Sequence, residues 1–236
     1  MTDIKNAIKL DERNHVEKPL LDQLHGLGWE IIDLTDEKQK PEDTYRKNFT
    51  EVGMLPVLQE QLKVINPWLE DDQIEDAIKQ LTSSLSTKGL IENNQYTLQL
   101  LLENISVSEN RKTGQQSPTV RFIDFKEQKN NRFVAVCQFK VRILGTEHHI
   151  VPDIVLFVNG LPVVLIECKS PKVKDAIPEA IDQILRYSEQ RGAKGEGSAP
   201  LFYFNQFIVV TCRQEAKFGT ITTHSEKHFY RWSIQQ

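Results

Sequence analysis

Residues 152–169 read Pro-Asp-Ile-Val-Leu-Phe-Val-Asn-Gly-Leu-Pro-Val-Val-Leu-Ile-Glu-Cys-Lys, and this stretch decides the fold. Two apolar runs, 153–158 and 161–168, flank an Asn-Gly pair, the strongest short-range signal of a β-hairpin. Because both runs are apolar on each face, they predict central strands covered on both sides of a sheet. Charged residues stand only at the strand ends away from the turn: Asp153, Glu167 and Lys169.

These three side chains suit a divalent-metal site. In a pleated strand Glu167 and Lys169 point to the same side, about 6.6–6.8 Å apart, and Cys168 points to the other. Mg²⁺ is usually held by one or two carboxylates together with waters and substrate phosphate. We predict Asp153, Glu167 and the backbone carbonyl of Cys168 as metal ligands, and Lys169 as the cation that completes a phosphodiester-hydrolysing site. The alternative for Glu167 and Lys169 is a solvated pair at a sheet edge.

The register of the hairpin decides whether this site can assemble. With a strict two-residue loop at Asn159-Gly160, Asp153 would pair with Ile166, and Glu167 would face away from Asp153. We therefore predict a one-residue correction of register, either a bulge or a three-residue loop, because bulges re-aim side chains beside active sites. A regular ladder from 153 to 166 would count heavily against the site.

Apolar residues at helical spacing predict three helical regions. The first spans 14–29, where Pro19 fits only in the first turn, so Glu17 is expected at the entrance of that helix. A helical insertion follows over about 41–110, and one of its stripes comprises Ile74, Ala77, Ile78, Leu81 and Leu85. The third region is 176–190, with a stripe of Ile177, Ala180, Ile181, Ile184 and Leu185.

Strands account for most of the remaining chain. Alternating apolar and polar residues predict a strand over 133–143, and residues 206–212 predict one more. Residues 111–118 are the most linker-like segment. We therefore predict a single α/β domain over 1–236, a mixed central sheet flanked by helices, with the core assigned to 14–30 and 119–236.

Composition excludes several classes of protein. The chain is 39% hydrophobic and 26% charged, and no apolar run approaches the roughly 18 residues that cross a bilayer. The first residues lack the regions of a secretory signal, and Cys137, Cys168 and Cys212 show no Cys-x-x-Cys spacing, so we expect a cytoplasmic protein. The net charge of −4 excludes DNA binding by bulk electrostatics. Any DNA contact must use a local patch, made of Lys169, Lys172, Lys174, Arg186, Arg191 and Lys194. The alternative for these residues is a solvated surface of mixed charge, since Asp175, Glu179, Asp182 and Glu189 are interleaved with them.

The predicted helix 176–190 contributes a second polar group. Gln183 and Tyr187 are four residues apart and share a helix face, and Arg186 lies beside them. Their polar ends flank the apolar stripe and could reach the rim of the site to contact DNA. In the alternative interpretation Tyr187 packs at the edge of the core and Gln183 caps a loop.

Asp153 with Glu167-Cys168-Lys169 resembles the PD-(D/E)xK nuclease motif, and Gln183-Ile-Leu-Arg-Tyr187 resembles the Gln-x-x-x-Tyr element of its recombination-helicase branch. More narrowly, the chain resembles the N-terminal endonuclease domain of the motor (R) subunit of type I restriction-modification enzymes. The matching stretches begin at His15, Asn131, Pro152, Ile166, Gln183 and Pro200. Cys168 departs from the pattern, since an apolar residue is more usual there.

This resemblance implies a restriction-endonuclease-like fold and Mg²⁺-dependent cleavage of double-stranded DNA at places not set by local sequence. It also implies a fragment that lacks the ATP-driven motor domains. ATP and S-adenosylmethionine would act only in the full complex, where methyltransferase (modification) and specificity subunits are the partners. Glu17 would orient a metal-bound water or Lys169.

Two other functions stay open. The fold could serve as a DNA-binding or docking module, with catalysis elsewhere. It could instead be the nuclease of a DNA-repair helicase, which should prefer free ends to closed circles.

Overall fold

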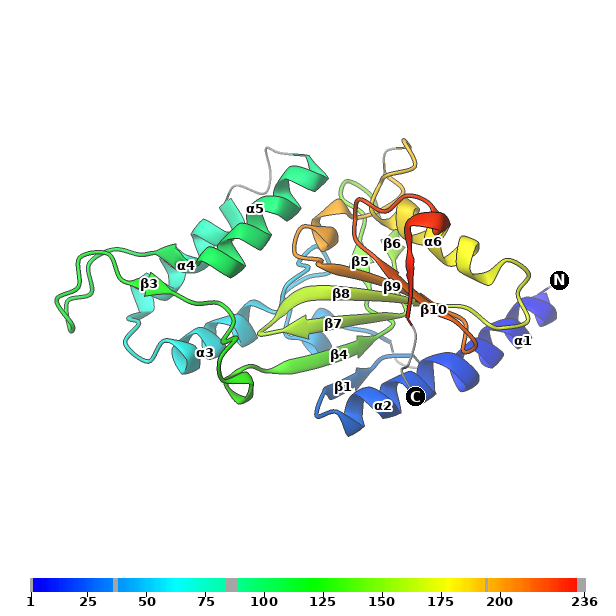
Figure 1. The fold of residues 1–236 in the computed structure, drawn as a ribbon, viewed down its shortest axis with the longest axis horizontal. Coiled ribbons are helices and arrows are strands. Elements are labelled where there is room, and N and C mark those ends of the chain that lie inside the picture. Colours follow the sequence, from blue (N-terminus) through cyan, green and yellow to red (C-terminus); the bar gives the residue numbers. More distant parts are fainter. Residues whose placement is uncertain (1, 36–37, 84–88, 194, 233–236) are drawn as a thin grey trace.

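The computed structural model describes residues 2–35, 38–83, 89–193 and 195–232. A seven-stranded mixed sheet runs through it in the order β1-β4-β7-β8-β9-β10-β11 (Figure 1). Its strands are β1 (Glu30–Asp33), β4 (Phe133–Cys137), β7 (Ile154–Val158), β8 (Leu161–Cys168), β9 (Phe207–Thr211), β10 (Ala216–Gly219) and β11 (Tyr230–Arg231). The pairs β1–β4 and β8–β9 are parallel and the other pairs are antiparallel. The predicted α/β class with a mixed sheet is confirmed.

The central hairpin β7–β8 turns at Asn159-Gly160, as the sequence predicts. Both residues have positive φ, 53° and 83°, which is the requirement of a type I′ turn. Glycine is required at the second position because a Cβ on Gly160 would lie 2.5 Å from the carbonyl oxygen of Met54. The turn is held from outside the hairpin, since the Met54 N–H donates to the Gly160 carbonyl at 2.8 Å.

Helices cover both faces of the sheet around β7 and β8 (Figure 1). On one face, α6 (Ala176–Tyr187) buries Ile177, Ala180, Ile181 and Ile184 in a cluster that also holds Leu165, Ile208 and Val210. On the other face lies a helical run of α1 (Thr2–Glu12), a π-helical turn (Arg13–Glu17) and α2 (Lys18–Gly26). Its buried residues are Val16, Leu21 and Leu24, which pack on Ala135, Ile154 and Ile166.

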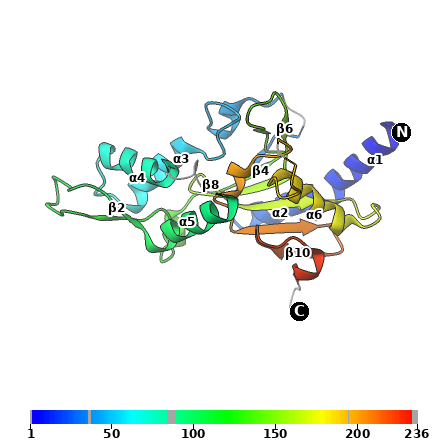
Figure 2. The ribbon, with the colours of Figure 1, turned by 90° about the horizontal axis from the view of Figure 1, so that it is seen from above.

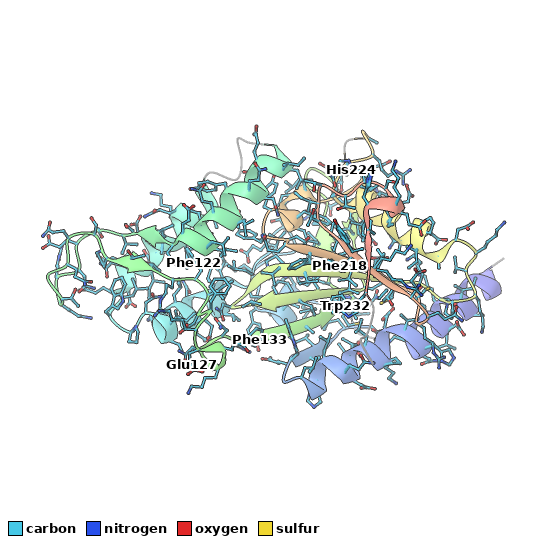
Figure 3. All side chains as sticks on the ribbon, in the orientation of Figure 1. Phe122, Glu127, Phe133, Phe218, His224 and Trp232 are labelled. Atoms are coloured by element: carbon cyan, nitrogen blue, oxygen red, sulfur yellow. The ribbon has the colours of Figure 1, made fainter. Side chains whose placement is uncertain are left out.

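A helical group lies beyond the turn end of the hairpin (Figures 1 and 2). It consists of α3 (Leu55–Ile65), α4 (Asp71–Ser83) and α5 (Leu90–Glu103), together with the short pair β2 (Ile105–Ser106) and β3 (Thr119–Val120). These elements share a hydrophobic cluster that includes Leu62, Leu81, Leu101 and Phe122; Phe122 is labelled in Figure 3. The predicted helical insertion is therefore present, although Leu85 of the predicted stripe lies outside the described residues.

The segment 111–118 is the connection of the β2–β3 hairpin rather than a linker. Asn110 and Gln115 form a bridge across it, and the buried Asn110 amide donates to the Trp68 carbonyl at 2.8 Å. Val120 and Phe122, which follow it, pack with the helical group.

The predicted strand 133–143 is interrupted, and this prediction was wrong. The strand ends at Cys137 because Gln138 has a φ of 59°. After the break, β5 (Val141–Arg142) pairs with β6 (His149–Ile150) in a separate two-stranded sheet. The alternating pattern resumes in phase after the break, so the sequence gives no sign of it.

The described residues also form four short 3₁₀ turns: Pro41–Thr44, Gln128–Asn130, Ala199–Phe202 and Glu226–His228. Within the described part of the chain, none of the helices combines the length and the apolar character that a bilayer crossing requires.

Candidate active site

The hairpin register brings the predicted carboxylates together. Val158 pairs with Leu161 and Phe157 with Pro162, but Leu156 pairs with Val164, so a bulge at Val163 shifts the ladder by one residue. Ile154 consequently pairs with Ile166, which sets Asp153 opposite Glu167 at the open end of the hairpin. The predicted register correction is confirmed.

Asp153 is held by the strand that carries its partners. The Cys168 N–H donates to Oδ2 of Asp153 at 2.7 Å, and the Gln138 amide donates to Oδ1 at 3.2 Å. Asp153 is 7% exposed and Glu167 is fully buried. Two carboxyl groups are therefore fixed side by side away from bulk water.

Lys169 supplies the cation of the site. Its Nζ lies 3.0 Å from Oε1 of Glu167 and donates to the Cys168 carbonyl at 3.1 Å. That carbonyl is the predicted third ligand, and it retains a second lone pair. The other oxygen of Glu167, Oε2, is buried without a hydrogen-bond partner among the described residues.

The π-helical turn brings two more carboxylates beside Asp153, in a group that does not include Glu167. Glu12, Glu17 and Asp153 each place an oxygen so that all three lie within 4.8 Å of one another. In an α-helix, residues five apart do not share a face, but the wider i→i+5 turn over Arg13–Glu17 aligns Glu12 with Glu17.

Glu17 was predicted at a helix entrance, and it directly precedes α2 as its N-cap residue. The sequence did not indicate the helical residues before it: the helical run begins upstream at Thr2, so Glu17 lies within that run. Pro19 occupies the first turn of α2 directly after the π-helical turn, where its missing N–H is tolerated. Arg13 anchors Glu17 through an ion pair of 3.1 Å between Nη1 and Oε2.

Burial makes the carboxylates of the cluster hard to ionise. It raises the pKa of Asp153, and burial together with the charge of Asp153 raises the pKa of Glu167 well above its usual range. Burial and the charge of Asp153 also raise the pKa of Glu12 to about 7. Burial opposes the charge of Lys169, but the carboxylates of Glu167 and Asp153 outweigh it and raise the lysine pKa. The arrangement is short of positive charge, which a bound cation would supply.

Two residues of this cluster were missed in the sequence. The sequence did not indicate Glu12, because Glu12 and Glu17 are five residues apart and would lie on different faces of an α-helix. Gln138 looked like a solvent-facing residue of a longer strand. Its left-handed backbone turns its amide toward both acids, 3.2 Å from Asp153 and 3.4 Å from Oε1 of Glu17.

On α6, Tyr187 lies beneath the surface. It is 4% exposed, its hydroxyl donates to the Val151 carbonyl at 3.3 Å, and the Gln183 amide donates to that hydroxyl at 2.7 Å. Arg186 lies over the Tyr187 ring, 4.9 Å from its centroid. Burial raises the pKa of the Tyr187 hydroxyl, and the charges of Glu167 and Asp153 raise it further. The pair thus lies within electrostatic reach of the acids, and its contact with DNA remains a prediction.

Acids neutralise two exposed cations of the predicted basic patch. Lys172 pairs with Asp11 at 2.6 Å, and Arg191 pairs with Asp182 at 3.1 Å. Lys169 is buried in the site, and Lys194 lies outside the described residues.

The comparisons with known proteins agree on one family. The model described as "Type I restriction enzyme R protein N terminus" matches residues 9–227. The HindI endonuclease subunit of Haemophilus influenzae, a type I restriction enzyme, is 30% identical over 221 residues, which is 94% of this chain and 20% of that protein. The MjaVIIIP endonuclease subunit of Methanocaldococcus jannaschii is 32% identical over 231 residues, with the same coverage of 94% and 20%. The chain thus spans about a fifth of the length of these relatives.

Proposed function

Because this chain belongs to the family of type I restriction enzyme R protein N termini, we propose that it is the endonuclease region of such a subunit and hydrolyses phosphodiester bonds of double-stranded DNA. The observation that carries the proposal is the meeting of Asp153, Glu167 and Lys169 at the open end of the β7–β8 hairpin. Cleavage is proposed to depend on Mg²⁺ and to be independent of local sequence.

The residues of the site fit a divalent metal ion. Carboxylate oxygens are the ligands that Mg²⁺ prefers, and Asp153, Glu167 and the Cys168 carbonyl are proposed to hold it. Oε2 of Glu167 is buried and has no hydrogen-bond partner in the described structure, as expected of an oxygen that coordinates a metal ion. Glu12 and Glu17 each place an oxygen within 4.8 Å of an oxygen of Asp153, so they border this ligand set on the side of Asp153. A bound Mg²⁺ would polarise the scissile phosphate and lower the pKa of its water.

The protein side chains position the substrate and balance charge. Lys169 keeps its proton, because Glu167 and Asp153 raise its pKa, and it is therefore a fixed cation for a phosphate oxygen. Gln138 donates to both Asp153 and Glu17, which fixes the orientation of the two carboxylates. Glu17 is proposed to orient the attacking water. Gln183 and Tyr187, with Arg186, are proposed to border the path of the DNA backbone.

The remaining activities of a type I enzyme are proposed to lie elsewhere. The motor, its ATP, and the methyltransferase and specificity subunits with S-adenosylmethionine belong to the larger complex, in which DNA is delivered to this site. We place the complex in the cytoplasm, where its DNA substrate lies.

The test is cleavage of a closed circular plasmid by the assembled complex in the presence of Mg²⁺. Glu167→Gln should abolish cleavage and leave ATP hydrolysis unchanged, because only the nuclease site loses a charge. Glu75→Gln, on the exposed face of α4, is the matched control and should cut normally. Cleavage that survives Glu167→Gln would refute the assignment.

The same substrate separates the other candidate functions. A docking module would leave a circular plasmid intact in every variant, including the unmodified complex. The nuclease of a repair helicase would cut linear DNA from its ends and spare the circle.

A further inference from the structure

Half of one sheet face has no helix over it in the described structure. The cluster beneath α2 packs on β4, β7 and β8 and reaches β9 only at the half-buried Val209. Beyond Val209, strands β9, β10 and β11 carry Phe207, Phe218 and Tyr230, and Trp232 directly follows β11. Figure 3 shows Phe218 and Trp232 together at the front of this part of the sheet. We call these four residues the aromatic face.

Sheet register places the four side chains on one side. Phe218 pairs with Val209 on one neighbouring strand and with Tyr230 on the other, so all three point the same way. The Phe218 ring stacks on Tyr230 with centroids 5.7 Å apart, and meets Trp232 edge-on at 5.7 Å and Phe207 at 6.5 Å. Phe207, Tyr230 and Trp232 are nevertheless 50%, 71% and 59% exposed. The rings contact one another on one side and water on the other.

The absence of charged strand residues on the aromatic face favours a protein as its partner. The strand residues that share its side are uncharged: Phe207, Val209, Thr211, Ala216, Phe218 and Tyr230. The cations of these strands alternate to the other side, where Lys217 pairs with Glu226 at 2.6 Å. Single-stranded nucleic acid would require cations beside the stacking rings. An exposed, uncharged aromatic patch is instead typical of a buried protein interface.

We propose that the aromatic face is covered by polypeptide that follows this region in a full-length subunit. This inference depends on the proposed function, which makes the chain part of a longer protein. The family match is to an R protein N terminus, and the HindI endonuclease subunit is covered over only 20% of its length. Tyr230 and Trp232 belong to this face and are the last aromatic residues of the described structure, so polypeptide that follows them in a full-length subunit starts beside the face.

The test uses the full-length subunit with p-benzoylphenylalanine in place of Trp232. Irradiation should give an intramolecular crosslink to a peptide C-terminal to residue 236, identified by mass spectrometry. The same photoreactive residue in place of Phe125, which is 63% exposed on a loop outside the face, is the matched control and should give no such crosslink.

Three results would overturn the proposal: crosslinks only between two copies of the chain, crosslinks to added single-stranded DNA, or no more crosslinking at Trp232 than at Phe125. The first would make the face a dimer interface and the second a nucleic-acid site. Glu167→Gln in the same subunit should crosslink normally, so failure here leaves the nuclease proposal intact.

A second measurement does not require the photoreactive residue. The paired variant Tyr230→Ser and Trp232→Ser should release the nuclease region by limited proteolysis about tenfold faster, because buried aromatic anchors dominate interface energies. Phe125→Ser should leave the rate unchanged. Equal rates for the two variants would contradict the proposal.

Discussion

The two ends of the β7–β8 hairpin both bury polar side chains, but they differ in how completely those side chains are hydrogen-bonded. At the turn end, Asn159 is fully buried, and its amide donates to the Phe122 carbonyl and to Asn131, each at 2.8 Å. Its side-chain oxygen accepts from the Arg132 N–H at 2.8 Å. At the open end, Glu167 is equally buried and has one oxygen without a partner among the described residues.

The difference separates a structural polar group from a functional one. A buried neutral amide with every hydrogen bond made fixes a turn and the segments around it. Buried carboxylates that repel one another destabilise the metal-free fold, because burial and mutual repulsion raise their pKa values. Such an arrangement persists where a ligand compensates it. The predictions below separate these two roles.

The largest expected effect is on catalysis at the open end. Lys169→Ala should lower cleavage by the assembled complex by about 10²–10³-fold or more, since it removes the fixed cation of the site. The fold should survive, because Glu167 can take up a proton when its partner is lost. Plasmid cleavage and circular dichroism measure the two properties. Lys129→Ala, an exposed lysine, is the control, and undiminished cleavage by Lys169→Ala would remove the lysine from the mechanism.

The turn end should show the reverse pattern. Asn159→Ala should destabilise the protein by about 2–3 kcal/mol, because it leaves the Phe122 carbonyl and the Arg132 N–H without partners and places alanine at a φ of 53°. Urea unfolding gives the free energy. Cleavage per folded molecule should be unchanged. A stability loss below about 0.5 kcal/mol would show that the amide network contributes little.

A smaller effect is expected from Glu12, at the edge of the acidic cluster. Glu12→Gln should weaken Mg²⁺ binding by about tenfold, since a charge within 4.8 Å of Asp153 and Glu17 is lost. Isothermal titration calorimetry of the full-length subunit measures the affinity. Glu75→Gln again provides the comparison, and equal affinities for the two variants would exclude Glu12 from the metal site.

The smallest effect is a pH dependence of stability without metal. The pKa of Glu12 is raised from 4.5 to about 7, so the folded state holds more protons than the unfolded state between these values. The contribution of Glu12 to the free energy of unfolding is therefore fully present below pH 4.5 and is lost as the pH rises through 7. The expected loss is on the order of 1 kcal/mol, because solvent screens this partly exposed group. Thermal unfolding in a chelator from pH 5 to 8 measures it. Stability that rises over this range in the wild-type protein would contradict the raised pKa.

The sequence predicted the hairpin, its turn and the need for a register correction. Asn159-Gly160 is a local signal, since the positive φ values of that turn belong to these residues. The bulge followed from a geometric requirement: without it, Asp153 and Glu167 would lie on opposite faces. The sequence did not indicate that the extra residue would be Val163, because an apolar strand can bulge at several positions with similar packing.

Glu12, Gln138 and the π-helical turn could not be predicted in this way. Helical periodicity finds faces of an α-helix, and a single wider turn shifts the face without changing the composition. The break at Gln138 likewise leaves the alternating pattern of residues 133–143 in phase. Both depend on the backbone conformation of one or two residues, which packing against the sheet decides.

By itself, then, the sequence determined the α/β class, the central hairpin and the three charged residues at its open end, because each follows from local periodicity and turn chemistry. Only the tertiary structure decided which further carboxylates join Asp153, that Tyr187 lies below the surface, and that the aromatic face is left without a helix. Those features depend on contacts between segments far apart in the chain, and the free energy of such contacts is not encoded in any one segment.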